Sequence, residues 1–218
     1  MSASVQLRDY EVRFRREEYI ASIALDWRVE AGHRNSPDFN IVRFICDVLK
    51  KRWTKKGTLQ IRFFDSNSDE DLAYVTFQPL TLHVDREIWR VAELGDPLAR
   101  FILAHEVGHI ILHDHHAKAF SPFEPGKKRR TINEISAEWQ ANTFAEYLLL
   151  PDHIVGAFYD STELAKWCSV ERKLAEERMQ ALQRARRPRV QIDGDFCIQC
   201  GEFTTRVAGN VKCPKCEQ

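Results

Sequence analysis

Apolar residues recur with a helical period over much of the chain, and a short central region is instead rich in β-branched and aromatic residues. In SPDFNIVRFICDVLKKRW (36–53) they return every three or four positions, which predicts an amphipathic helix with Ser36 as N-cap and Pro37 at its first position. An apolar patch at 20–27 predicts a shorter helix before it. Three stretches rich in β-branched and aromatic residues follow, at residues 58–65, 73–79 and 80–85. These stretches predict a small, three-stranded sheet.

The second half of the chain is predicted to be helical. Asp96 and Pro97 are typical of a helix start, and helical apolar spacing continues from them into a histidine-rich run. Thr131 and Glu134 fit a capping box, and the helix they open must end before Pro151, which cannot continue it. Two further helices are predicted near residues 161–168 and 170–186.

The order of these elements predicts an α+β fold, in which a small antiparallel or mixed sheet packs on a helical bundle. Residues 184–189, RARRPR, are basic and contain a proline, and the composition changes after them. We therefore expect an N-terminal extension at 1–35, a main domain at 36–188 and a small C-terminal module at 189–218.

The charge balance excludes a general electrostatic preference. Lys and Arg together number 32, as do Asp and Glu, so no overall field attracts nucleic acid or an anionic membrane. The N-terminus lacks an apolar signal core, and no run of about 18 apolar residues occurs. We expect a cytoplasmic protein without a membrane partner.

One predicted helix is unusually rich in histidine. Within RFILAHEVGHIILHDHH (100–116), His105 and His109 share one helix face, so both imidazoles can bind one ion, and Glu106 lies one step round. This HExxH pattern is typical of zinc hydrolases, whose glutamate takes a proton from metal-bound water. The alternative is histidines that are only solvated or hydrogen-bonded in the core. It is disfavoured because unpaired inward imidazoles are costly to desolvate, and Gly108 on that face indicates a close approach by another element.

A catalytic zinc needs a third protein ligand and an open fourth position. The helix that follows offers three glutamates. Glu134 is explained by the capping box, and Glu146 falls away from the inward stripe. Glu138 shares that stripe, where a carboxylate needs a cation, so it is the predicted third ligand. Asn142 could hydrogen-bond that carboxylate or a histidine.

Two other histidines lie near this motif. His113 continues the ligand face, but a ligand so close in sequence would strain the geometry, so we expect it to support a ligand or stabilise the helix end. His83, in the strand before the helix, could stabilise an oxyanion, although an exposed strand position is the favoured interpretation.

The six cysteines fall into two groups. Four form two CxxC pairs near the C-terminus, at Cys197, Cys200, Cys213 and Cys216. Their spacing is that of a zinc ribbon, whose metal would be structural because protein fills all four positions. A module this small would depend on that zinc for folding. Cys46 and Cys168 stand alone in apolar surroundings and are interpreted as core residues.

HEVGHIILH, followed by ExxAN-x-FA at 138–145 and LLLP at 148–151, resembles the ImmA/IrrE family of zinc-dependent peptidases. LTLHVDREIW before the motif and CSVERKLAEERMQAL after it extend the similarity. The resemblance implies that His105, His109 and Glu138 bind the catalytic zinc and that Glu106 is the general base. Family members often sit beside a helix-turn-helix repressor and cut or inactivate it, which switches on a mobile-element, stress or defence operon. No fused helix-turn-helix is recognisable here, so the repressor would be a separate protein.

The sequence therefore predicts a zinc-dependent endopeptidase with one catalytic and one structural zinc. The alternative is a non-catalytic regulator that binds DNA or a protein partner through the ribbon; the intact Glu106 and the lack of an evident fourth ligand argue against it. GKKRR (126–130) and RARRPR could contact phosphates, which would make nucleic acid an activating signal. A solvated loop and linker remain the favoured interpretation of these charges.

Overall fold

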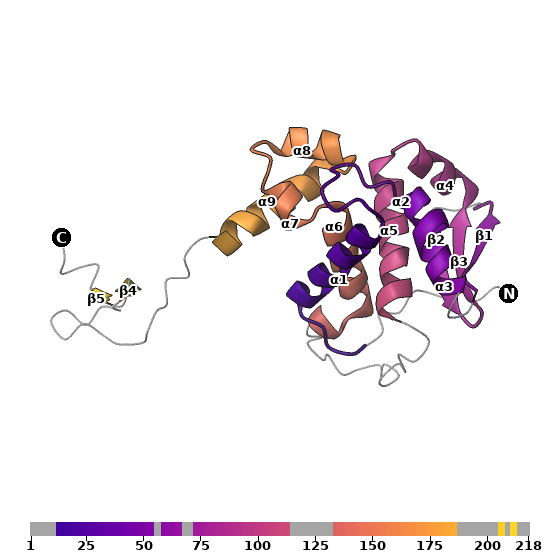
Figure 1. Ribbon diagram of the computed structural model, residues 1–218, viewed down its shortest axis with the longest axis horizontal. Coiled ribbons are helices and arrows are strands. Elements are labelled where there is room, and N and C mark those ends of the chain that lie inside the picture. The colour runs from indigo at the N-terminus through magenta and orange to yellow at the C-terminus, as the bar shows by residue number, and fades with distance from the viewer. Residues whose placement is uncertain are drawn as a thin grey trace. The chain divides into compact units, whose positions relative to one another are not determined.

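The computed structural model describes residues 12–54, 58–66, 72–113, 133–186, 205–207 and 210–212 (Figure 1). By its internal contacts the chain divides into two units, at residues 1–179 and 180–218. No helix among the described residues is long and apolar enough to cross a membrane.

A three-stranded mixed sheet lies in the first unit. Its strands are β1 (Gln60–Phe64), β2 (Ala73–Phe77) and β3 (Leu80–Asp85), in the order β1-β3-β2. The central strand β3 runs parallel to β1 and antiparallel to β2. Leu82 and Val84 of β3 are fully buried, because alternate side chains of the strand face the helices. The sheet confirms the expected α+β class, and of the two expected arrangements, antiparallel or mixed, it has the mixed one.

Helices make up most of the rest of the unit. The longer ones are α1 (Glu17–Glu30), α4 (Arg86–Glu93), α5 (Pro97–Leu112), α6 (Ala137–Leu149), α8 (Ser161–Cys168) and α9 (Arg172–Arg186). The shorter ones are α2 (Ile41–Arg43), a π-helix (Phe44–Leu49), α3 (Lys50–Thr54), a 3-10 turn (Asn133–Ile135) and α7 (Asp152–Val155). The sequence pattern did not indicate α4 or α7.

Helix α5 is central to the fold. It packs between β2 of the sheet and α6, and α6 packs in turn on α1 (Figure 1). Gly108 allows this contact, because a Cβ atom there would lie 3.0 Å from the backbone oxygen of Ala141 and 3.1 Å from its Cα. The close approach expected from Gly108 is therefore made by α6.

The predicted N-terminal cap is confirmed for α5 and is wrong for α6. The Asp96 side chain accepts a hydrogen bond from the Ala99 amide at 2.8 Å, with Pro97 in the first turn, as predicted. The predicted capping box of α6 is wrong: the helix begins at Ala137, and Ser136 accepts from the Trp139 amide at 2.9 Å. Glu134 lies instead in the preceding 3-10 turn, while Thr131 is outside the described residues.

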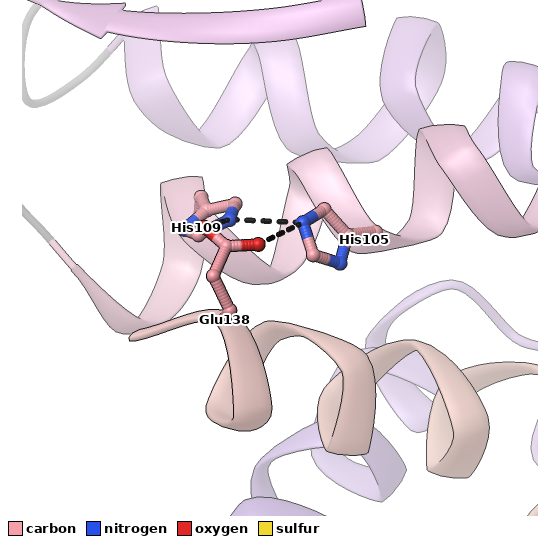
Figure 2. Close-up of side chains that lie close together, drawn as sticks. All are labelled: His105, His109 and Glu138. Carbon is pink, nitrogen blue, oxygen red and sulfur yellow. Dashed lines mark hydrogen bonds and ion pairs between the residues drawn. The ribbon is translucent and has the colours of Figure 1, made fainter. Parts of the chain in front are cut away.

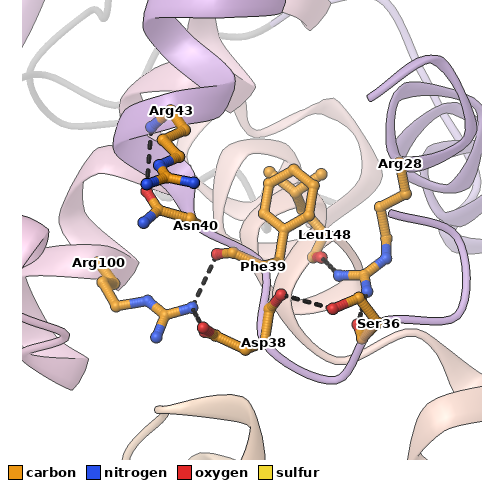
Figure 3. A network of polar contacts seen from close by, with 8 residues as sticks. All are labelled: Arg28, Ser36, Asp38, Phe39, Asn40, Arg43, Arg100 and Leu148. Atoms are coloured by element: carbon orange, nitrogen blue, oxygen red, sulfur yellow. Dashed lines mark hydrogen bonds and ion pairs between the residues drawn. The ribbon is translucent and has the colours of Figure 1, made fainter. Parts of the chain in front are cut away.

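The predicted helix at 36–53 also begins later than expected, at Ile41. Asn40 is its N-cap and accepts a hydrogen bond from the Arg43 amide at 3.0 Å. The segment before it is held outside the helix by two buried arginines (Figure 3). Arg28 donates to the Ser36 carbonyl, and Arg100 donates to the Phe39 carbonyl at 2.7 Å. Tertiary hydrogen bonds thus override the local start signal of Ser36 and Pro37.

The interpretation of the two lone cysteines is half right. Cys168 is buried at the end of α8, but Cys46 in the π-helix is exposed. Ile45 and Leu49, four positions apart, both point into the core. Cys46 follows Ile45 around the helix and so faces away from it.

In the second unit, the structure describes two short strands. They are β4 (Thr205–Val207) and β5 (Asn210–Lys212), paired antiparallel with Thr205 opposite Lys212. The four cysteines of the predicted ribbon and the basic stretch GKKRR lie outside the described residues.

Candidate metal centre

Three ligand-type side chains converge between α5 and α6 (Figure 2). His105 and His109 project from α5, and Glu138 projects from the first turn of α6. The two histidine Nε2 atoms are 3.0 Å apart. Glu138 places one carboxylate oxygen 3.3 Å from His105 Nε2 and the other 3.4 Å from His109 Nε2. The α-helical spacing of four and the close packing at Gly108 together produce this convergence.

The donor set fits a zinc ion in size and chemistry. Ligand atoms held about 2.0 to 2.1 Å from one tetrahedral ion lie about 3.3 Å from one another. In the cluster the two Nε2 atoms are 3.0 Å apart, and each lies 3.3 or 3.4 Å from a different carboxylate oxygen of Glu138, so the three residues are close enough to contact one ion. Two imidazoles and one carboxylate are also a ligand combination found in catalytic zinc sites, which keep one position open. Among the described residues, no further His, Cys, Asp or Glu joins the group.

The orientation of His105 is fixed by Asn142. His105 Nδ1 lies 2.8 Å from Asn142 Oδ1, and an amide oxygen can only accept, so Nδ1 carries the hydrogen. In the neutral ring the Nε2 lone pair then points at His109 and Glu138. Asn142 was expected to bond either the carboxylate or a histidine, and in this structure it contacts His105.

His109 is supported on its other side by His113. The Nδ1 atoms of the two rings are 3.1 Å apart, and His113 Nε2 lies 3.1 Å from Gln140 Oε1. His113 caps the C-terminal end of α5 and is buried. Burial and the charge of His109 lower the pKa of His113 to about 3; the hydrogen bond that His113 donates to Gln140 opposes this change, and the charge of Arg15 adds to it. The ring is therefore neutral at physiological pH.

The cluster attracts positive charge. Burial tends to lower the pKa of His105, but its hydrogen bond to Glu138 and the charges of Glu106 and Glu138 raise it overall. Hydrogen bonds from His105 and His109 hold the pKa of Glu138 well below its ordinary value. The carboxylate of Glu138 thus favours a positive charge beside it, which is the behaviour expected of a cation site.

Glu106 lies beside the cluster and is 7% exposed. Burial raises its pKa to about 7; the charge of His105 opposes this change and that of Glu138 adds to it. A carboxyl group with a pKa near neutrality can both accept and release a proton at physiological pH.

Comparison with known proteins identifies the family of the chain. Residues 60–180 match the Peptidase_M78 family, described as an IrrE N-terminal-like domain, and this span is more than half of the chain. The chain belongs to the Peptidase_M78 family. Membership supports a metallopeptidase-like enzyme, and it confirms the resemblance to the ImmA/IrrE peptidases at the level of the family.

The solved structures add a likeness of fold to the Peptidase_M78 assignment. The chain is similar to a Mycobacterium tuberculosis transcriptional regulator, with a TM-score of 0.50 and 16% sequence identity over 78% of this chain. The alignment spans about half of that protein, 49% of its length. A search of the curated proteins found no match.

Within the Peptidase_M78 domain, the structure brings together His105, His109 and Glu138, with Asn142 and His113 in contact with the two histidines. His83 makes its contacts within the sheet: its ring stacks on Tyr74 at 4.4 Å, and Nε2 lies 3.2 Å from Thr76 Oγ1. These contacts favour a structural role for His83.

Sequence reasoning missed Gln140 and Arg15. Gln140 Oε1 lies 3.1 Å from His113 and accepts a hydrogen bond from Arg15 at 2.9 Å. A signal for Gln140 existed, since it is a polar residue on the buried face of a helix. Arg15 had none, because it lies in a non-helical segment far from the motif in sequence.

Proposed function

We propose that the chain is a zinc-dependent endopeptidase whose catalytic zinc is held by His105, His109 and Glu138. The observation that carries the proposal is the convergence of two imidazole nitrogens and a carboxylate at distances that fit one zinc ion, beside the buried Glu106. Membership of the Peptidase_M78 family supports it.

A zinc ion bound there would act as a Lewis acid, polarising a peptide carbonyl and acidifying the attacking water. Glu106 would accept the proton of that water and deliver it to the leaving amine. Asn142 would keep His105 turned toward the ion by accepting the hydrogen of Nδ1. A substrate segment could lie extended along an edge of the sheet, where main-chain hydrogen bonds give affinity without demanding sequence.

For the substrate, we propose a separate helix-turn-helix transcriptional repressor, whose cleavage derepresses a mobile-element, stress or defence operon. Family membership and the likeness to a transcriptional regulator support a regulatory setting. The domain division at about residue 188 and the four-cysteine zinc ribbon at 189–218 remain proposals from the sequence, and the ribbon is a candidate docking module for that repressor. Activation by nucleic acid remains a prediction from the basic stretches.

The test compares the zinc-loaded wild type with Glu106→Gln on a proteome-derived peptide library, with new N-termini counted by mass spectrometry. Glu106→Gln is expected to retain zinc and to cleave about 10² to 10⁴ times more slowly, because it cannot accept the proton. Arg16→Ala, which changes an exposed side chain, is the control and should cleave normally.

Two outcomes would contradict the proposal. Cleavage by Glu106→Gln at the wild-type rate would remove Glu106 from the mechanism. A wild type that binds zinc at the histidines but cleaves neither the library nor helix-turn-helix repressors would favour the non-catalytic regulator.

A further inference from the structure

Gln140 is a fully buried residue on α6, and both its amide nitrogen and its amide oxygen have hydrogen-bond partners. Its Nε2 group donates to the carbonyl of Arg13 at 2.9 Å and to that of Glu134 at 2.7 Å. Both amide hydrogens are therefore used, and the side-chain oxygen must face the opposite way.

That oxygen determines which nitrogen of His113 carries a hydrogen. It accepts from Arg15 Nη1 at 2.9 Å and lies 3.1 Å from His113 Nε2. An amide oxygen and a guanidinium cannot exchange roles, because the first only accepts and the second only donates. His113 Nε2 must therefore be the donor in its contact with Gln140.

The same assignment of donors and acceptors applies to His109. A neutral imidazole has one donor and one acceptor, so His113 Nδ1 is the acceptor. It lies 3.1 Å from His109 Nδ1, which must then carry the hydrogen. The remaining nitrogen, His109 Nε2, is left with its lone pair toward His105 and Glu138.

We propose that Gln140 and Arg15 are positioning residues, which set the tautomer and orientation of His109 through His113. The inference rests on the proposed function, because it assigns these residues a purpose only if His109 binds zinc. The relay runs from Arg15 through Gln140 and His113 to His109, whereas Asn142 contacts His105.

The segment that supplies Arg15 is fastened to both helices of the site. The Val12 amide donates to the carbonyl of Ile135 at 2.7 Å, and the Arg15 amide donates to that of Glu134 at 3.1 Å. Arg15 Nη2 also donates to the carbonyl of Leu112 at the end of α5, at 2.6 Å. Residues 12–15 thus join the end of α5 to the start of α6, so part of the expected N-terminal extension belongs to the site.

The test uses the full chain with Gln140→Leu, Arg15→Ala and the neighbouring control Arg16→Ala. Zinc affinity of the histidine site is measured by competition with a chromophoric chelator. Gln140→Leu is expected to weaken it about tenfold, the lower end of effects seen for residues that support metal ligands. Arg15→Ala should weaken it less, because His113 keeps its acceptor, and Arg15→Lys should restore part of the loss.

A second readout separates positioning from folding. Long-range ¹H–¹⁵N correlation spectra of the zinc-loaded chain report which imidazole nitrogen bears hydrogen. The wild type and Arg16→Ala should show His113 protonated at Nε2, whereas Gln140→Leu should show a mixture of tautomers. Circular dichroism checks the fold, and Arg15→Ala, at a half-buried position, provides the answer if Gln140→Leu fails to fold.

The outcomes distinguish the two proposals. A wild type with no zinc at the histidines would contradict the proposed function. A wild type that binds zinc there, together with variants of unchanged affinity and unchanged His113 tautomer, would overturn the relay alone.

Discussion

Two groups of polar side chains lie on or against the central helices, and they differ in what their atoms offer. At the cluster of His105, His109 and Glu138, each half-buried residue places a ligand-type atom within 4.8 Å of those of the other two. Around the segment at 36–40, the buried Arg28 and Arg100 donate hydrogen bonds to backbone carbonyls (Figure 3). The first group offers a set of ligand atoms for a cation, whereas the second directs its own cations to the protein backbone.

The comparison teaches that burial of polar residues does not by itself indicate function. Arg28 is more deeply buried than any member of the cluster, with no exposed surface. It donates to the carbonyl of Leu148 at 2.6 Å and to that of Ser36, so it fastens the end of α6 to the segment before α2. What distinguishes the candidate metal centre is the convergence of ligand-type atoms from three residues.

The largest expected effect tests whether the cluster requires a cation. His105→Ala combined with His109→Ala should lower the zinc content by one ion per chain, because two of three ligands are lost. Zinc is measured by elemental analysis after gel filtration. His153→Ala, which removes an exposed histidine from α7, should keep the wild-type content. Equal zinc in the double variant and the wild type would break the comparison, since the cluster would then hold no zinc.

A smaller effect tests whether the arginine group is structural. Arg28→Met should lower the free energy of unfolding by about 3 kcal/mol, because two buried carbonyls lose their donor. Urea unfolding measures the change, and zinc affinity should not alter. Arg43→Met, at an exposed position on the neighbouring helix, should cost little. Loss of zinc without loss of stability in Arg28→Met would mean that the two regions are coupled.

The smallest effect concerns pH and the carboxyl beside the cluster. In the zinc-free chain, burial raises the pKa of Glu106 to about 7 from an ordinary 4.5. Between these values the folded state binds a proton that the unfolded state releases, so the stability due to Glu106 falls as the pH rises through that window. The difference between the wild type and Glu106→Gln should change by about 2 to 3 kcal/mol between pH 4.5 and pH 7.5. A difference that does not vary with pH would show that the surroundings do not raise the pKa of Glu106.

The sequence by itself determined those features that depend on residues close together in the chain. Helical spacing placed His105 and His109 on one face, the cap at Asp96 fixed the start of α5, and stretches rich in β-branched and aromatic residues identified the strands. Gly108 indicated a close neighbour, because a glycine inside a helix needs a compensating reason. Glu138 was predicted as a ligand because it lies on the inward face of the next helix, where a carboxylate needs a partner such as a cation.

Only the tertiary structure decided the rest. The start of the helix at Ile41 and the exposure of Cys46 depend on contacts with distant residues, which outweigh local start signals. Likewise, Arg15 reaches Gln140 across 125 positions of sequence. Such contacts produce no repeating pattern of residues in the sequence, because hydrogen bonds between separate elements depend on how those elements pack. The candidate ligands, together with Asn142 and His113, could therefore be predicted from spacing along two helices, whereas the contact of Arg15 with Gln140 could not.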